Sequence, residues 1–236
     1  MSVLKIPFIL LDAINMRLNA TPPNPPVPLA DNIIPDWRER FLKSLARPSA
    51  LLRAMYWLVG FIEVVVILAS QQPSGWVSKR ILSILILNGS SPLRIRITPL
   101  FIFGNFLGVF GTALRVQCYR TLGRLFTFEL CICKDHTLIV SGPYAFIRHP
   151  SYTGLILTIV GAYCNNATGS WLKECGLLET LTGKLLLLVW LSIATAVVAS
   201  LLLRVPREDE ILQSKFGDEW EEWAQKVRYR LVPGVY

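Results

Sequence analysis

Charged residues and histidines are scarce in this sequence. Only 17% of the 236 residues are Asp, Glu, Lys or Arg, whereas 53% are hydrophobic, and only two are histidines. This composition excludes an ordinary water-soluble domain. The net charge of +8 in so apolar a chain indicates Lys and Arg side chains beside anionic lipid, and it argues against nucleic-acid binding.

Cysteine is also sparse, with five residues at irregular spacing. This number and spacing exclude a disulfide framework. Cys131 and Cys133 with the two histidines do not have the spacing of the common zinc patterns, so no metal site is expected. Ser151 is followed by nothing that resembles a nucleophile elbow, which leaves a serine hydrolase unsupported.

Four apolar stretches are long enough to cross a bilayer, which takes about 20 mostly apolar residues. They are Ala50–Ser70, Ile97–Cys118, Ser151–Leu172 and Leu185–Leu203. The sequence therefore predicts an all-α, polytopic integral membrane helical bundle. Two shorter apolar stretches, Val3–Ile14 and Ile81–Leu87, leave open whether they enter the membrane.

Charge and small residues refine this prediction. The basic loop before the third span is expected in the cytosol, and four spans then place both termini there. Gly104 and Gly108 have the small-xxx-small spacing that lets two helices approach closely in lipid. Glu63 is the only acid inside the first span; burying it unpaired is expensive, so it is expected to face other helices or a polar cavity.

The segment after the last span has the pattern of an amphipathic helix. Beyond Pro206, apolar residues recur at steps of four, four, three and four, at Leu212, Phe216, Trp220, Trp223 and Val227. This is one face of a helix. Because Trp favours the headgroup layer, the helix is expected to lie along the membrane as a C-terminal interfacial helix.

Residues 136–154 hold both histidines and run directly into the third span. Polar, ionisable and glycine-rich sequence is costly beside a membrane span unless it binds something, so a site is expected at this boundary. A second block holds Arg204 and the acids Glu208–Glu210. Taken alone, Arg204 could be snorkelling at the end of a span, and the acids could complement a helix dipole.

Together the two blocks resemble the isoprenylcysteine carboxyl methyltransferase family, and more loosely the integral-membrane methyltransferases that include phospholipid N-methyltransferases. The resemblance covers roughly residues 98–236. The motifs that carry it are the loop from His136, Gly142-Pro-Tyr, Arg148-His-Pro-Ser-Tyr-Thr-Gly154, Arg204 followed by Glu208-Asp209-Glu210, Phe216-Gly217 and Pro233-Gly234.

The resemblance implies that S-adenosylmethionine is held between the 136–152 loop and the tail. By position, the implied cofactor-binding residues are His136, Thr137, Leu138, Ile139, Tyr144, His149, Pro150, Ser151, Tyr152 and Glu208. Arg204 matches the family residue that faces the substrate carboxylate. Family members can have Gln where this chain has Glu129, so Glu129 is left out of the site.

The function implied is methyl transfer to the C-terminal prenylcysteine carboxylate of prenylated proteins. The reaction is expected at the cytosolic face of the endoplasmic reticulum membrane, in contact with membrane lipids. No metal is expected. Two alternatives stay open, namely N-methylation of a phospholipid headgroup and a non-catalytic lipid or partner binder. The chain is expected to divide into an amphipathic and Pro-rich segment (1–49), two spans with a re-entrant piece (50–118) and a methyltransferase core (119–236). The acceptor's prenyl length and the oligomeric state are left open.

Overall fold

The computed structural model describes residues 2–25, 40, 44, 46–128 and 137–235. Its described part contains helices and connecting turns but no strand, so the predicted all-α class is confirmed there. The α-helices are α1 (Ile6–Ala20), α3 (Ala46–Ala69), α4 (Trp76–Leu85), α5 (Pro99–Leu122), α6 (Pro150–Ala167), α7 (Trp171–Glu174), α8 (Leu181–Phe216) and α9 (Asp218–Lys226). Glu129, Cys131, Cys133 and His136 lie outside the described residues.

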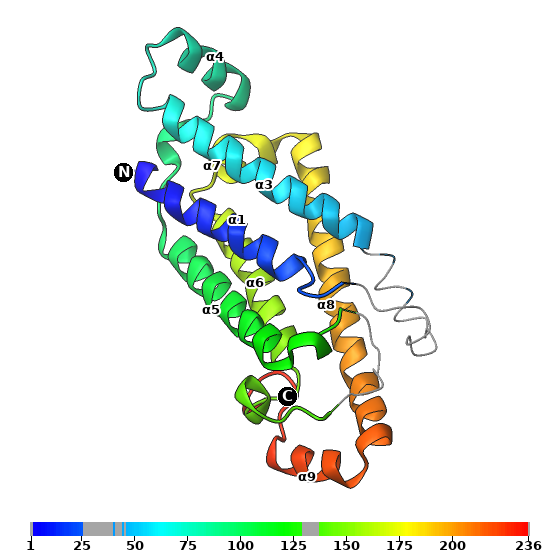
Figure 1. Cartoon of the computed structure of the whole chain (residues 1–236). Helices are drawn as coiled ribbons and strands as arrows, with labels where there is room; N and C mark the ends of the chain where they lie inside the picture. Colours follow the sequence, from blue (N-terminus) through cyan, green and yellow to red (C-terminus); the bar gives the residue numbers. More distant parts are fainter. Residues whose placement is uncertain (1, 26–39, 41–43, 45, 129–136, 236) are drawn as a thin grey trace.

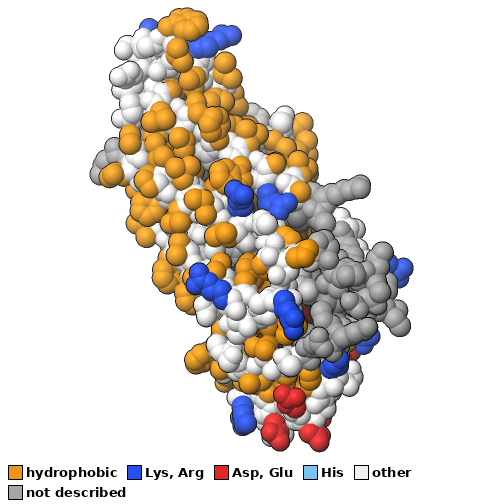
Figure 2. All heavy atoms as spheres, viewed as in Figure 1, with side chains coloured by type: hydrophobic (Ala, Val, Ile, Leu, Met, Phe, Trp, Pro, Cys, Tyr) orange, Lys and Arg blue, Asp and Glu red, His pale blue; other side chains and the backbone are white. Residues whose placement is uncertain are grey.

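Helices α1, α3, α5, α6 and α8 extend along one elongated bundle (Figure 1). Helices α4 and α7 lie at one end of it, and α9 lies at the other end. Hydrophobic side chains cover most of the face between these ends (Figure 2), as expected for a surface in contact with lipid.

The structure places the two termini at opposite ends of this bundle (Figure 1). At one end Lys5 Nζ donates a hydrogen bond to Gly169 O (2.7 Å), and at the other Asn24 Nδ2 donates to Gly123 O (2.8 Å). This arrangement differs from the expectation that both termini lie on one side, because α1 packs lengthwise beside α3 and α5 and adds a helix to the bundle (Figure 1).

Two of the four predicted spans are helices long and apolar enough to cross a membrane: Pro99–Leu125 and Leu181–Phe216. Helices α3 and α6 occupy the other two predicted stretches. The third prediction extends too far, because α6 ends at Ala167 and Gly169 takes a left-handed conformation (φ 65°) before α7 begins.

Helices α5 and α6 pack through facing glycines. A Cβ added at Gly111 would lie 2.4 Å from Gly154 O, and one at Gly161 would lie 2.5 Å from Gly104 O. Contacts this short leave no room for a side chain, so the backbones themselves are in contact. The close approach predicted from Gly104 and Gly108 is confirmed and extends along the helix pair.

Helix α1 presents a polar stripe to the bundle and an apolar face outward. Its exposed side chains include Phe8 (42%) and Leu11 (41%), whereas Asp12 is only 5% exposed. Val3–Ile14 is thus part of a helix packed lengthwise in the bundle. Its apolar pattern is interrupted by polar residues such as Asp12, which face other helices.

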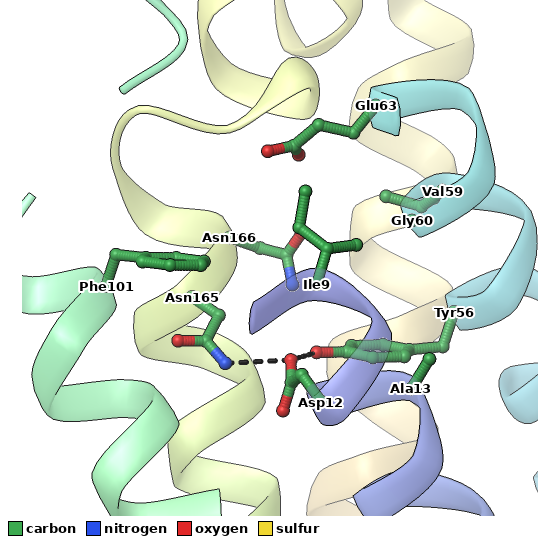
Figure 3. A pocket seen from close by; sticks show the side chains of 10 residues that line it. All are labelled: Ile9, Asp12, Ala13, Tyr56, Val59, Gly60, Glu63, Phe101, Asn165 and Asn166. Carbon is green, nitrogen blue, oxygen red and sulfur yellow. Dashed lines mark hydrogen bonds between the residues drawn. The ribbon is translucent and has the colours of Figure 1, made fainter. Parts of the chain in front are cut away.

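The polar stripe of α1 meets acids and amides from α3 and α6. Lys5 is fully buried and its Nζ donates to Glu63 Oε1 (2.5 Å), so Glu63 is paired within the bundle as expected. Asp12 accepts hydrogen bonds from Tyr56 and from Asn165 Nδ2 (Figure 3). A cavity of about 30 Å³ lies beside these side chains, which is room for a water molecule or two.

The tail differs from its prediction in two ways. Helix α8 continues through Pro206 and ends at Gly217 (φ 52°), so no new helix begins at Pro206. The predicted apolar face does form one cluster, but it packs inward: Trp220 (8% exposed) and Trp223 (6%) contact the half-buried Leu138. These tryptophans were expected to contact the headgroup layer, but they contact Leu138 of the same chain instead.

Candidate active site

The motif loop ends where α6 begins, and this junction fixes His149. Pro150 occupies the first turn of α6, where its missing N–H costs no hydrogen bond, and His149 is the N-cap residue. The His149 side chain is buried (5% exposed), and its ring stacks on that of Tyr152 with centroids 5.5 Å apart. Both side chains face the end of α8.

Glu208 of α8 lies beside this ring pair. Its Oε2 accepts a hydrogen bond from Tyr152 Oη (2.5 Å) and lies 3.9 Å from His149 Nδ1. One helical turn earlier, Arg204 Nε is 3.8 Å from the same oxygen. The two distant blocks predicted to form a site therefore meet around one carboxylate.

Arg204 is buried (6% exposed), and its NH1 donates to Phe128 O (2.7 Å). A guanidinium has five N–H donors in a fixed plane, so it can hold a main-chain carbonyl and also bind a carboxylate. Its position beside Glu208 and Tyr152 fits the role that the resemblance implies.

Asp209, the neighbour of Glu208, lies at the centre of an ionic network. Its carboxylate accepts hydrogen bonds from Arg148 NH1 (2.9 Å), His149 Nε2 (3.0 Å) and Arg230 Nε (3.0 Å). It is only 4% exposed. Asp209 thus joins α8 to the motif loop and to the segment after α9.

Residues 228–231, here called the C-terminal strap, run along the motif loop. The main-chain N–H groups of Arg148 and His149 donate to Tyr229 O (2.9 Å) and Arg230 O (2.8 Å). Thr153 Oγ1 donates to Leu231 O (2.7 Å). These bonds, together with Asp209, fix the backbone on which His149 is mounted.

Ser151 is held from α5. Arg115 NH1 donates to Ser151 Oγ (2.8 Å) and to Ser151 O (3.0 Å), while Arg115 Nε donates to Tyr119 Oη (2.7 Å). The Arg115 side chain is 5% exposed and bonded inside the bundle, so it is not available to lipid phosphate.

Leu138 and Tyr144 form the side of the site nearest α9. Trp223 Nε1 donates to Tyr144 O (3.1 Å), and both residues pack on the Trp220–Trp223 cluster. Burial, with the Cys118 and Glu208 groups nearby, raises the pKa of the Tyr144 phenol well above its usual range. The phenol is therefore neutral at physiological pH and can donate a hydrogen bond.

The structure brings most predicted site residues together at one end of the bundle. Glu208 lies beside Arg204, His149 and Tyr152, and its charge also acts on Tyr144. Pro150 and Ser151 follow His149 at the start of α6, where Ser151 is bonded to Arg115. Leu138 contacts the tryptophan cluster, Ile139 is half-buried and Thr137 is exposed. His136, predicted as a cofactor-binding residue, lies outside the described residues.

Sequence reasoning missed Asp209, Arg230 and Arg115. The sequence places Asp209 in the Glu208-Asp209-Glu210 motif and among acids suited to a helix N-terminus, but it indicates no partner for it. Its partners lie 61 and 21 residues away along the chain, a separation that spacing rules cannot bridge. The sequence offered two signals for this network: an acid directly after Glu208, and an Arg near the Pro233-Gly234 motif.

Part of the chain is similar in sequence to known proteins. Residues 104–168 match the family model described as the isoprenylcysteine carboxyl methyltransferase (ICMT) family. A probable protein-S-isoprenylcysteine O-methyltransferase of Oryza sativa subsp. indica is 32% identical over 126 residues, covering 52% of this chain and 56% of the relative. The protein-S-isoprenylcysteine O-methyltransferase of Homo sapiens is 31% identical over 137 residues, covering 56% of this chain and 41% of the relative.

A Delta(14)-sterol reductase of Mus musculus is 30% identical over 99 residues, or 42% of this chain and 20% of that protein. The chain spans about half the length, 56%, of the first curated relative it matches, and less of the human one. Residues 104–168 are thus similar to the family that the motifs predict, that of the isoprenylcysteine carboxyl methyltransferases.

Proposed function

We propose that this chain is an integral membrane enzyme that transfers a methyl group from S-adenosylmethionine to the C-terminal prenylcysteine carboxylate of prenylated proteins. The observation that carries the proposal is the convergence of His149, Tyr152 and Arg204 on the Glu208 carboxylate. Relatives whose names include protein-S-isoprenylcysteine O-methyltransferase support the same acceptor.

The side chains at this site fit S-adenosylmethionine. The cofactor carries an ammonium group and ribose hydroxyls, and Glu208 offers a carboxylate whose side chain keeps 26% of its surface open. Leu138 and Tyr144 add apolar and aromatic surface for an adenine ring. The residues proposed to hold the cofactor are His136, Thr137, Leu138, Ile139, Tyr144, His149, Pro150, Ser151, Tyr152 and Glu208.

The proposed chemistry needs alignment more than proton transfer. When bound, S-adenosylmethionine supplies a methyl group on a positively charged sulfur. An acceptor carboxylate, with a free pKa of about 3.5, is already ionised at neutral pH, so no residue has to remove a proton. His149 and Tyr152 then position groups by hydrogen bonding, and neither acts as a general base.

Arg204 is the proposed substrate anchor. A hydrated carboxylate is a poor nucleophile, because water must be displaced before it can attack. A buried guanidinium replaces that water with a fixed, planar partner and so orients the attacking oxygen. The prenyl chain stays in lipid while its polar end reaches the Arg204 guanidinium.

We further propose that the bundle is polytopic, that it lies in the endoplasmic reticulum membrane and that the site faces the cytosol. The bias of Lys and Arg toward the site end of the chain supports this orientation. The acceptors are prenylated protein C-termini or smaller prenylcysteines.

The test is radiolabelled methyl transfer from S-adenosylmethionine to a farnesylated cysteine analogue, in membranes that contain the full chain. We expect a base-labile methyl ester. Arg204→Ala should lower kcat/KM roughly 100-fold or more, as removal of a preorganised charged donor does, with cofactor affinity nearly unchanged. Glu208→Gln should instead weaken cofactor binding about tenfold or more, because a charge-assisted hydrogen bond is lost.

The same assay separates the alternatives. N-methylation of a phospholipid headgroup would give a base-stable product and a rate that rises with pH toward the amine pKa, because a neutral amine is required. Cofactor binding without any transfer would identify a non-catalytic relative. Near-normal esterification by the Arg204→Ala variant would refute the substrate anchor.

A further inference from the structure

Helix α4 (Trp76–Leu85) contributes no residue to the proposed function. It lies at the end of the bundle opposite α9 (Figure 1), and none of its residues is buried. Trp76 is 81% exposed, Val77 58% and Ile84 56%. Large apolar side chains this exposed on a short helix need a partner outside the chain.

One side of α4 is already occupied by the protein. Leu82 and Leu85 pack against the core cluster that contains Val66 and Ile67 of α3. Trp171 Nε1 also donates to Leu85 O (2.9 Å), which fixes the helix against α7. The orientation of α4 on the bundle is thus set by these contacts.

The exposed apolar side chains lie beside this packed side. At about 100° per residue, Val77 and Ile84 fall about 20° apart, next to the Leu85 side of the helix. Going around the axis of α4 from Ile84, away from Leu85, the next side chain is Arg80. Trp76, Ser83 and Lys79 follow and form the polar side of the helix. Apolar, aromatic and basic side chains therefore follow one another around the helix.

Basic side chains gather at this end of the molecule. Lys79 and Arg80 are exposed on α4, and Arg94 and Arg96 are exposed on the connection to α5. Within the described part of the chain no acid forms an ion pair with any of these four. Figure 2 shows basic and hydrophobic side chains adjacent at this end.

We propose that α4 is a membrane-surface helix that binds phospholipid headgroups. Val77 and Ile84 enter the outer part of the acyl layer, Trp76 lies at headgroup depth, and Lys79 and Arg80 bind lipid phosphate. The binding surface belongs to the leaflet opposite the proposed active site. This proposal rests on the membrane location in the proposed function, but not on methyl transfer.

The test measures depth by lipid quenching. The full chain carrying Ile84→Cys, labelled with bimane, is reconstituted in phosphatidylcholine bilayers with a nitroxide near the top of the acyl chain. The matched control is Ser83→Cys, one residue away on the polar side, and the unsubstituted chain gives the background from native cysteines. We expect the Ile84 label to be quenched several-fold more than the Ser83 label.

The headgroup contact is tested with the same label. Nitroxide phosphatidylglycerol and nitroxide phosphatidylcholine are compared, and their quenching gives a relative association constant at α4. We expect several-fold preference for phosphatidylglycerol, lost when Lys79→Gln and Arg80→Gln are combined, because each basic residue near an anionic surface adds about fivefold. Glu179→Gln, an exposed acid at the same end, should leave that constant unreduced.

Three outcomes would overturn the proposal. Equal weak quenching of both labels would mean that α4 does not touch the bilayer. Equal strong quenching would place the whole helix inside the acyl layer, not at its surface. An unchanged lipid preference after both basic residues are removed would refute the phosphate contact. Methyl transfer measured on the same preparations reports separately on the proposed function.

Discussion

Glu208 and Asp209 are adjacent acids with different surroundings. They point about 100° apart on α8, so the Glu208 side chain keeps 26% of its surface open while that of Asp209 keeps 6%. Glu208 is therefore available to a ligand, whereas Asp209 is committed to two arginines and a histidine within the chain.

Replacing Asp209 by Asn should destabilise the fold around the site. The substitution keeps the shape but removes the charge that balances Arg148 and Arg230, and breaking a buried ionic pair costs about 3 kcal/mol. We expect a lower melting temperature in detergent and a loss of methyl transfer. The matched control is Glu210→Gln, since Glu210 pairs with Arg207 on the surface, where the pair adds little. Equal melting temperatures for the two variants would contradict the role given to Asp209.

For single residues, the sequence predicted which side chains lie together in the candidate site better than it predicted their contacts. Arg204, His149, Tyr152 and Glu208 came from ordered motifs, and the structure brings them together. The Asp209 network could not be predicted, because it depends on the C-terminal strap returning to the motif loop. No local pattern specifies that return.

Among the elements, the α5–α6 pair packs through close contacts at its glycines. Gly111→Ala places a Cβ 2.4 Å from Gly154 O, so the helices must separate; overpacking of this kind costs about 1–3 kcal/mol. We expect a lower melting temperature and less protein in the membrane. Gly75→Ala, where the nearest atom would be 3.5 Å away, is the matched control.

A melting temperature of Gly111→Ala equal to that of Gly75→Ala would show that the glycine contact is not required. The sequence predicted this packing from two glycines, because small residues at a spacing of four imply close approach. It did not predict where elements end. The pattern beyond Pro206 predicts a new helix there, whereas α8 passes through Pro206 and is capped by Gly217.

For the whole molecule, α1 decides the relation between the termini. Hydropathy alone gave four spans and termini on one side. The structure adds α1 as a further lengthwise helix of the bundle, because its polar residues pair inside the bundle, as Asp12 does with Asn165. Helices of this kind escape composition tests, since the partners of their polar residues are far away in sequence.

The corresponding prediction concerns accessibility in sealed vesicles. Single cysteines at Ser2, Ser74 and Val235 are treated with a membrane-impermeant maleimide. We expect Ser2→Cys and Ser74→Cys to react from the same side and Val235→Cys from the opposite side. Reaction of Ser2→Cys together with Val235→Cys would place α1 outside the membrane and contradict an arrangement in which all five long helices cross it.

The C-terminal strap also affects the order of events during synthesis. A ribosome makes residues 228–231 after every helix of the bundle, yet they pair with the backbone of Arg148 and His149. All five long helices can thus be in place while His149 still lacks its final support. A nascent chain at that stage holds its long helices but lacks the two main-chain hydrogen bonds that fix Arg148 and His149.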